Sequence, residues 1–317
     1  MMMSSNKHNT DEHKKILAIE TTGPIASVAY IKNSDTLSCC STHLCLDNKG
    51  INELTSEKKL NHLSELVPMI GRLLSSSGLQ LDDLDALAVS AGPGSFTGTR
   101  IGISTARAIA QVTGLPVIKV PSLQALGFDF CCNEPAPIIC PVIDARLNQI
   151  YAGAYKFESD CSIKTLIPEG AYAAGNFLDR LRFKSMDERP VIFCGENPEL
   201  LGNLLDGGSF GFSYELIPSL QKASSVLKWA VLNPDTIDYQ NLEPIYLRKA
   251  EAQRKLDERL AAETRDKTDE QMAAETRGKA DEQMTAKTCC KVNKYPVAEN
   301  ICVEKKEYTE EKPDEER

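Results

Sequence analysis

Two acidic residues stand where an apolar run of the chain gives way to a tight turn. Glu20 follows the run 16–19 and precedes Thr21 and Thr22, and Asp144 follows the run 137–143. When two such hairpins face each other across a cleft, their amides and hydroxyls hold phosphates while the acids position a metal ion. Solvated acids at strand ends are the simpler interpretation, and it is favoured for either turn alone. For the matched pair, both interpretations stay open.

The loop GPGSFTG at 92–98 is the most distinctive segment of the sequence. Gly92, Gly94 and Gly98 permit positive φ angles and the close approach of another backbone. Ser95 is placed to cap the helix that follows, and a helix N-terminus attracts anions. The loop is not a Walker A motif, because Pro93 occupies the position of the required glycine and no lysine follows. A strand-to-helix turn without a ligand is therefore favoured unless a partner completes the site.

Metal centres and nucleophile triads find little support in the sequence. Among the four histidines, only His62 lies in a predicted helix, and the residues four positions away are Lys58 and Leu66. A helical two-histidine metal site needs a second histidine one turn away. Ser95 lacks the G-x-S-x-G context of a hydrolase nucleophile. We predict neither a metal site nor a catalytic residue.

The elements that must position these residues follow the same order in both halves of the chain. Each half reads as strand, acidic turn, strand, strand, helix, strand, helix, which predicts α/β layers. Two unrelated α/β units that share an order are the alternative. In the first half we predict strands at 16–19, 26–31, 36–41, 84–90 and 116–120, a polar loop to about 58, helices at 60–77 and 99–113, and a short helix capped by Ser122. In the second half we predict strands at 137–143, 150–157, 162–167 and 191–194, and helices at 175–182, near 196 and at 224–232.

The two long helices of the first half carry more apolar surface than one sheet face requires. The first has two stripes, Leu60, Leu63, Val67, Ile70 and Leu74 beside Leu66, Met69 and Leu73. The second repeats small residues every four positions, at Gly98, Gly102, Ala106 and Ala110. One stripe suffices to pack on a sheet, and a row of small residues lets another helix approach closely. We predict a helical subunit interface; the alternative is that these helices pack only on each other and on their own sheet.

Composition excludes several classes of protein. With 317 residues the chain is long enough for about two domains, and its net charge of -9 argues against binding nucleic acid unaided. The 11 cysteines include no C-x-x-C pair, so we expect free thiols in a reducing cytoplasm. No apolar stretch is long enough to span a membrane, so we expect a cytoplasmic protein with no membrane contact.

The predicted domain organisation has four parts. Residues 1–14 form a disordered N-terminus, 15–130 and 131–250 form two subdomains, and 251–317 form a charged, low-complexity tail. The tail contains a 12-residue repeat, AAETRDKTDEQM at 261–272 and AAETRGKADEQM at 273–284. Because it has almost no large apolar residues, we expect solvated disorder there.

Five segments together resemble the TsaB (YeaZ) family of the actin-like ATPase superfamily. They are ILAIETT at 16–22, NHLSELVP at 61–68, AGPGSFTGTRIGISTARAIA at 91–110, VIDAR at 142–146 and PIYLR at 244–248. The resemblance covers roughly residues 15–250. It implies two actin-like (ribonuclease-H-like) subdomains, each a mixed sheet flanked by helices.

The resemblance also implies a function. A TsaB protein is a non-catalytic subunit needed to form the threonylcarbamoyl group on N6 of the adenosine adjacent to the anticodon, in tRNAs that read codons beginning with adenine. It pairs through its N-terminal helices with the catalytic subunit TsaD, an ATPase subunit TsaE joins them, and tRNA is met only through the complex; a homodimer is expected when the chain is alone. The partner-binding residues expected here are Leu63, Leu66, Val67, Ile70, Gly98, Arg100, Gly102 and Ala106.

No tightly bound cofactor is expected, although the family fold leaves room for ATP or ADP with magnesium at the subunit junction. The expected ligand-binding residues are Glu20, Thr21, Thr22, Gly92, Gly94, Ser95 and Asp144. Two departures weaken this expectation, because Glu20 replaces the family's usual aspartate and Gly23 replaces a serine-like residue. The alternative function is an actin-like-fold ATPase or small-molecule kinase. A TsaD-like transferase is disfavoured, since the helical pair of histidines that TsaD uses for metal is missing.

Overall fold

A computed structural model describes residues 15–32, 50–57, 61–130, 136–158, 162–184, 190–207, 210–248 and 259. The chain divides into two compact units, Met1–Arg248 and Lys249–Arg317, and the account below concerns the first. The predictions for residues 1–14, for a strand at 36–41 and for the repeat tail at 251–317 lie outside the described residues.

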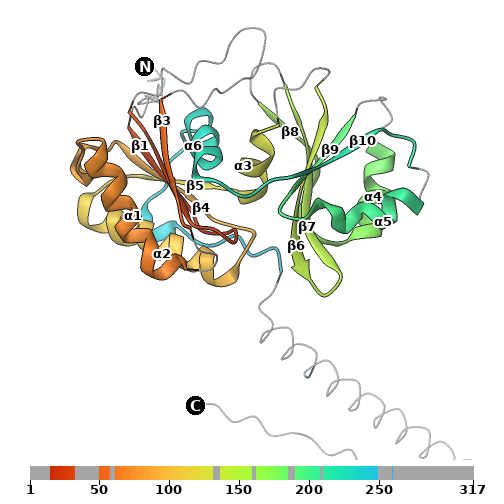
Figure 1. Ribbon diagram of the computed structural model, residues 1–317, viewed down its shortest axis with the longest axis horizontal. Coiled ribbons are helices and arrows are strands. Elements are labelled where there is room, and N and C mark those ends of the chain that lie inside the picture. The colour runs from red at the N-terminus through yellow and green to blue at the C-terminus, as the bar shows by residue number, and fades with distance from the viewer. Residues whose placement is uncertain are drawn as a thin grey trace, which may run out of the picture. The chain divides into compact units, whose positions relative to one another are not determined.

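The first half builds a five-stranded sheet with helices on both faces (Figure 1). Its order is β3-β2-β1-β4-β5, with β2 antiparallel to β1 and β3, and with β4 parallel to β1 and β5. Helices α1 and α2 pack on one face and α6 packs on the other, while α3 lies between α6 and the second sheet. The bounds are β1 Ile16–Glu20, β2 Ser27–Ile31, β3 Ile51–Thr55, β4 Ala86–Ser90, β5 Val117–Val120, α1 His62–Ser76, α2 Phe96–Thr113, α3 Ser122–Phe128 and α6 Ala223–Leu232.

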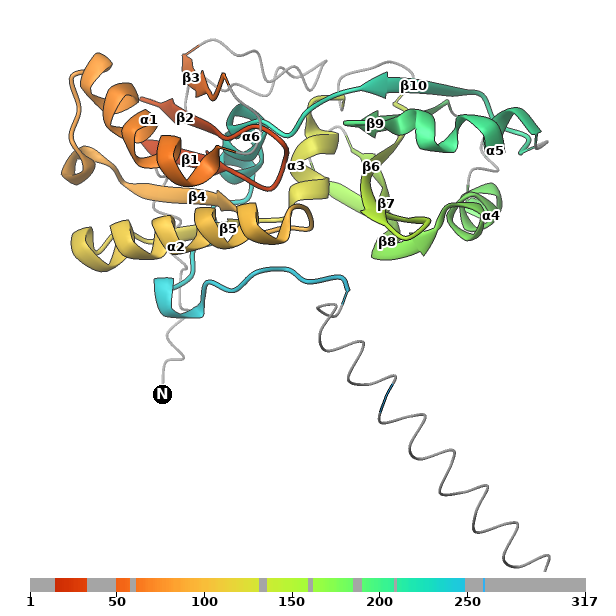
Figure 2. The same ribbon diagram turned by 60° about the horizontal axis from the view of Figure 1, so that its bottom comes forward.

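The second half repeats this topology. Its sheet has the order β8-β7-β6-β9-β10, with antiparallel pairs β6–β7 and β7–β8 and parallel pairs β6–β9 and β9–β10. Helices α4 and α5 lie on the face away from the first half (Figure 2). The bounds are β6 Ile138–Arg146, β7 Gln149–Phe157, β8 Ile163–Ala173, β9 Val191–Gly195, β10 Tyr214–Pro218, α4 Ala174–Lys184 and α5 Gly202–Gly207. The two sheets therefore have the same order and strand directions, which confirms the predicted α/β class and the structural repeat.

Five local features differ from the predictions. The strand β3 lies where we predicted a polar loop, and β10 was missed; each is an edge strand with partly exposed residues. Helix α2 starts at Phe96 instead of residue 99, because Ser95 caps it by accepting the Gly98 N–H. A 3-10 helix, Pro198–Leu201, precedes α5 where one helix was expected near 196. Ser122 does not cap α3; its hydroxyl accepts the Gly92 N–H at 3.0 Å.

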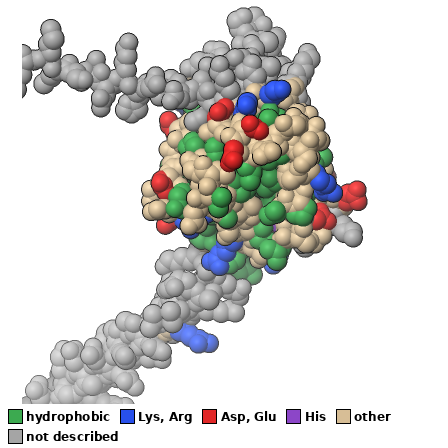
Figure 3. All heavy atoms as spheres, turned by 90° about the vertical axis from the view of Figure 1, so that its left-hand side faces the viewer, with side chains coloured by type: hydrophobic (Ala, Val, Ile, Leu, Met, Phe, Trp, Pro, Cys, Tyr) green, Lys and Arg blue, Asp and Glu red, His purple; other side chains and the backbone are tan. Residues whose placement is uncertain are grey.

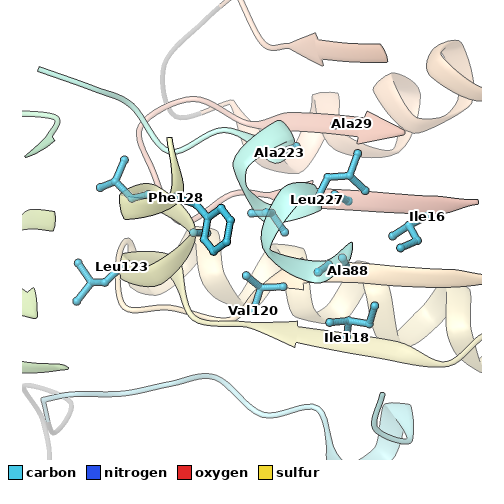
Figure 4. Close-up of a cluster of buried hydrophobic side chains, with 14 of the residues drawn as sticks. Ile16, Ala29, Ala88, Ile118, Val120, Leu123, Phe128, Ala223 and Leu227 are labelled. Carbon is cyan, nitrogen blue, oxygen red and sulfur yellow. The ribbon is translucent and has the colours of Figure 1, made fainter. Parts of the chain in front are cut away.

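One apolar core joins the two halves. Helix α6 lies on the first sheet, where Ala29 and Ala88 leave room for Ala223 and Leu227 to approach closely (Figure 4). The same core continues through α3 into the second sheet, where Phe128 meets Phe157 edge to face with ring centroids 5.1 Å apart. Edge-to-face packing of this kind stabilises beyond the buried area alone.

A polar layer borders this shared core. The Tyr155 hydroxyl donates to Glu169 at 2.7 Å, and the Trp229 indole N–H donates to Gln124 at 3.1 Å. Asp129, at the end of α3, accepts from Ser225 and pairs with Lys228, both on α6. The bonds of Gln124 and Asp129 tie α3 and α6 together between the sheets. None of the helices in the described part of the chain is long and apolar enough to cross a membrane.

Candidate functional site

The hairpin between β1 and β2 is closed on itself. The carboxyl of Glu20 is fully buried, and one of its oxygens accepts from both the hydroxyl of Thr22, at 2.6 Å, and the N–H of Thr22. Burial raises the pKa of Glu20, while hydrogen bonds from Thr22 and Ser90 act in the opposite direction. Glu20, which we predicted to face a ligand, therefore points into the protein, where its hydrogen bonds with Thr22 stabilise the turn.

The glycine loop packs directly against this hairpin. The Ser95 N–H donates to the Thr22 carbonyl at 2.7 Å, and the Thr21 hydroxyl donates to the Gly98 carbonyl at 2.7 Å. A Cβ on Gly94 would collide with the Thr22 carbonyl, and one on Gly98 would collide with the Thr21 carbonyl. The glycines are thus explained by contact between two pieces of backbone. This contact brings together five of the predicted ligand-binding residues: Glu20, Thr21, Thr22, Gly94 and Ser95. The polar side chains among them form hydrogen bonds within the hairpin and with the glycine loop.

The remaining glycine of the predicted set, Gly92, has a different neighbour. It has a φ of 107°, and a Cβ there would lie 2.8 Å from the Ile245 carbonyl oxygen. Residues 242–248, here called the C-terminal strap, cross the loop at this point, where the Ile245 N–H donates to the Ala91 carbonyl at 2.7 Å. The glycine loop is therefore covered by the strap on one side and by the hairpin on the other.

His62 and Gln221 complete the enclosure of the hairpin, and sequence reasoning assigned neither of them to it. His62, 4% exposed in the first turn of α1, places Nε2 3.1 Å from the Gly23 carbonyl, to which it donates as an N–H. Burial lowers the pKa of His62, so the ring is neutral near pH 7. Gln221 lies against Gly23, where a Cβ would be 2.8 Å from the side-chain oxygen Oε1. A polar residue at the start of an otherwise apolar helix was the available signal for His62.

The second hairpin presents its acid differently. Asp144 is exposed, and its Oδ1 accepts the Arg146 N–H at 2.6 Å. Arg146, Leu147 and Asn148 all have positive φ angles between 51° and 60°, so the turn is tight. The Arg248 guanidinium, on the strap, donates to the Ala145 carbonyl at 3.0 Å. The two acids that looked equivalent in sequence thus have different environments, one buried in a turn and one open to solvent.

Three of the predicted partner-binding residues are exposed and five are buried. Leu63 and Val67 on α1 are 80% and 61% exposed, and Arg100 on α2 is exposed. Leu66 and Ile70 belong to the core between α1 and the sheet. Gly98, Gly102 and Ala106 face β1 and β4, where a Cβ on Gly102 would collide with Thr21 Oγ1. The small-residue row therefore lets α2 pack on its own sheet and hairpin, which corrects the expectation that it meets a partner.

Exposed apolar side chains nevertheless gather at the α1–α2 end of the molecule (Figure 3). Leu63 and Val67 stand one turn apart on α1, and Phe96 and Val112 are exposed on α2. We call the solvent-facing side of these two helices the helical face. Larger exposed apolar patches on soluble proteins commonly mark interaction sites.

Comparison with known proteins gives a consistent result. The family model described as TsaD, tRNA N6-adenosine threonylcarbamoyltransferase, matches residues 53–253. The chain is 28% identical over 242 residues to the tRNA threonylcarbamoyladenosine biosynthesis protein TsaB of Bacillus subtilis, covering 76% of this chain and 96% of that protein. It is 28% identical to the TsaB protein of Escherichia coli over 255 residues, covering 76% and 98%. The structure of YeaZ from Pseudomonas aeruginosa superposes with a TM-score of 0.59 at 22% identity, covering 74% of this chain and all of that one, and so shows the same fold.

Substituting Gly98 by alanine tests the contact between loop and hairpin. We expect Gly98→Ala to lower the free energy of unfolding by about 3 kcal/mol, because its Cβ would meet backbone that cannot move independently. The matched control is Gly71→Ala in α1, where a Cβ meets nothing within 4 Å. There we expect a gain of up to about 1 kcal/mol from helix propensity. Urea unfolding of both variants measures the difference, and equal stabilities would refute the contact.

The buried carboxyl of Glu20 predicts a pH dependence of stability. Because the folded state raises the pKa of Glu20 above 4.5, it binds the proton more tightly than the unfolded chain does. The stabilisation is therefore present at low pH and is lost as the pH rises through the folded-state pKa. Relative to Glu20→Gln, which cannot titrate, we expect the free energy of unfolding of the unmodified chain to fall as the pH rises from 4.5 through the folded-state pKa of Glu20. A constant difference between the two proteins across this range would contradict the prediction.

Proposed function

We infer the function of this chain from its family: it belongs to the TsaD-type family and, within it, to the TsaB (YeaZ) proteins. Its role lies in the biosynthesis of threonylcarbamoyladenosine in tRNA. We propose that it is the non-catalytic subunit that binds and supports the catalytic subunit TsaD, with TsaE as a further partner. We further propose that it acts in the cytoplasm on tRNAs that read codons beginning with adenine, at the adenosine adjacent to the anticodon.

The exposure of Leu63 and Val67 carries this proposal. A surface helix normally turns its apolar side to the core, yet α1 buries Leu66, Met69 and Leu73 and still presents two large aliphatic side chains to solvent. Covering Leu63 and Val67 against a partner removes apolar surface from water at roughly 25 cal/mol per Å². A partner helix with a matching apolar side would supply that cover. We propose that TsaD does so, and that a second copy of this chain does so when TsaD is absent.

A supporting role agrees with how the polar groups are used. The hydroxyls and amides of the first hairpin and the glycine loop bond to one another, which leaves them poorly placed to receive a substrate. His62 donates to backbone, so it serves the fold and not a reacting group. The net charge of -9 also suits a protein that meets tRNA only through a complex.

Nucleotide binding by the chain alone fits this arrangement poorly. Of the predicted ligand-binding residues, Asp144 has an exposed carboxyl, whereas Glu20 is buried beneath its own hairpin. We propose that any ATP or ADP with magnesium binds at the junction with TsaD, where the partner contributes the missing groups. The alternative is an actin-like-fold ATPase or kinase, which would need a complete site within this chain.

Calorimetric titration separates these two alternatives. With ATP and magnesium added to the chain alone, we expect a dissociation constant weaker than about 0.1 mM. The titration is repeated with the equimolar complex of this chain and TsaD. Tight binding by the isolated chain would favour the ATPase or kinase.

Charged substitutions on α1 test the proposed partnership. We expect the double variant Leu63→Asp, Val67→Asp to lose co-purification with TsaD, because two carboxylates would be buried without partners. The same variant should fail to support modification in a reconstituted tRNA threonylcarbamoylation assay, and should be monomeric by light scattering. The matched control is Phe183→Asp on α4, which changes a side chain that is 76% exposed in the second half. If the assay proceeds equally well without this chain, the proposed function is wrong.

A further inference from the structure

Three side chains form a stacked cluster beside the helical face. The rings of Phe96 and Tyr246 stack with centroids 5.5 Å apart and planes inclined by 30°. The Arg100 guanidinium carbon lies 3.9 Å from the centre of the Phe96 ring, and Arg100 Nε donates to the Tyr246 hydroxyl at 2.9 Å. All three side chains are exposed, so burial in the core does not account for the arrangement.

The cluster fixes the direction of the guanidinium. An exposed arginine ordinarily samples many rotamers, and holding it in one geometry costs conformational entropy on binding. Here the ring of Phe96 contacts the guanidinium group from one side, and the hydroxyl of Tyr246 accepts a hydrogen bond from Nε. Within the part of the chain that the structure describes, the two η-nitrogens of Arg100 have no acceptor. They form a fork that is preorganised and open to solvent.

Tyr246 is itself held in place. The strap that carries it is fixed before this residue by the bond from the Ile245 N–H to the Ala91 carbonyl, and after it by the bond from Arg248 to the Ala145 carbonyl. Gly92 admits this crossing because a Cβ would meet the Ile245 carbonyl oxygen at 2.8 Å. The strap thereby brings Tyr246, which is 146 positions from Arg100 in the sequence, to the second turn of α2, where it orients Arg100.

The cluster borders the surface proposed to meet TsaD. Phe96 and Arg100 lie in the first two turns of α2, and Leu63 and Val67 lie in the first two turns of α1. These turns adjoin, because a Cβ on Gly98 would lie 3.3 Å from His62 Cδ2. Arginine and tyrosine are among the residue types enriched at the energetic hot spots of protein interfaces.

We propose that Arg100 receives a carboxylate of the catalytic subunit through its two η-nitrogens, and that Phe96 and Tyr246 are positioning residues for it. The inference rests on the proposed function and names the chemistry of the contact. Planar carboxylate groups match the guanidinium fork. A phosphate of tRNA has the same shape preference, but phosphate binding requires clustered cations, and the net charge of -9 opposes it. Because Arg100 adjoins the helical face, which is proposed to meet TsaD, a carboxylate of that protein is favoured over a tRNA phosphate.

The test measures the affinity of variant chains for purified TsaD by calorimetry. Arg100→Lys keeps the charge but loses the fork, and we expect it to weaken binding roughly tenfold or more. Tyr246→Phe keeps the ring but frees Nε, and we expect a loss of roughly threefold. Because Tyr246 acts through Arg100, the double variant should bind no more weakly than Arg100→Lys alone. Arg182→Lys, an exposed arginine on α4, should bind like the unmodified chain.

The outcomes separate this inference from the proposed function. If Arg100→Lys binds TsaD normally while Leu63→Asp, Val67→Asp does not, the carboxylate contact is wrong and the partnership stands. If Arg100→Lys lowers only the melting temperature, Arg100 serves to anchor the strap and the inference is overturned. It is equally overturned if subunit affinity is unchanged but the complex binds tRNA less well, since the ligand would then be phosphate. If the unmodified chain fails to bind TsaD, the proposed function fails as well.

Discussion

The structure depends on one close contact, in which the tip of the first hairpin fills the space in front of the glycine loop. Gly23, Gly94 and Gly98 cannot carry a Cβ without meeting Gln221, Thr22 or Thr21. The contact fixes where α2 begins, and His62 fixes α1 to the same turn. The outer sides of the two helices are therefore set relative to each other by backbone that lies beneath them. In this chain the polar groups of the hairpin and the glycine loop bond to one another and hold the first turns of the two helices in place.

The sequence predicted most of the architecture because the central strands are buried on both faces. Runs such as Ile16–Glu20 and Val191–Gly195 are almost wholly apolar, so the pattern is unambiguous. The two strands that it missed, β3 and β10, are edges whose residues are half exposed, and Asn52 and Glu53 dilute the apolar signal in β3. The predicted topological repeat is nevertheless correct, because it depends on the order of the elements and not on their boundaries.

The site was harder to predict, for physical reasons that differ among its residues. Counting apolar positions predicted that α1 has more apolar side chains than a sheet face can cover, and Leu63 and Val67 are exposed, whereas Leu66 and Ile70 of the same predicted set are buried in the core. A row of small residues has the same sequence pattern whether it faces a partner helix or its own sheet, so Gly98, Gly102 and Ala106 were misassigned. The role of Tyr246 could not be foreseen, because its contact with Arg100 depends on the path of the strap. Likewise, nothing in sequence distinguishes a buried Glu20 from an exposed Asp144.

The position of α6 has a consequence for the order in which the protein can mature on the ribosome. This helix spans Ala223–Leu232, yet it covers a face of the sheet that starts at Ile16. During synthesis that face stays bare until nearly the whole second half has emerged from the exit tunnel. The sheet of the first half therefore lacks a covering helix on this face during most of synthesis, and chaperones that bind exposed apolar strands would have a long interval in which to act.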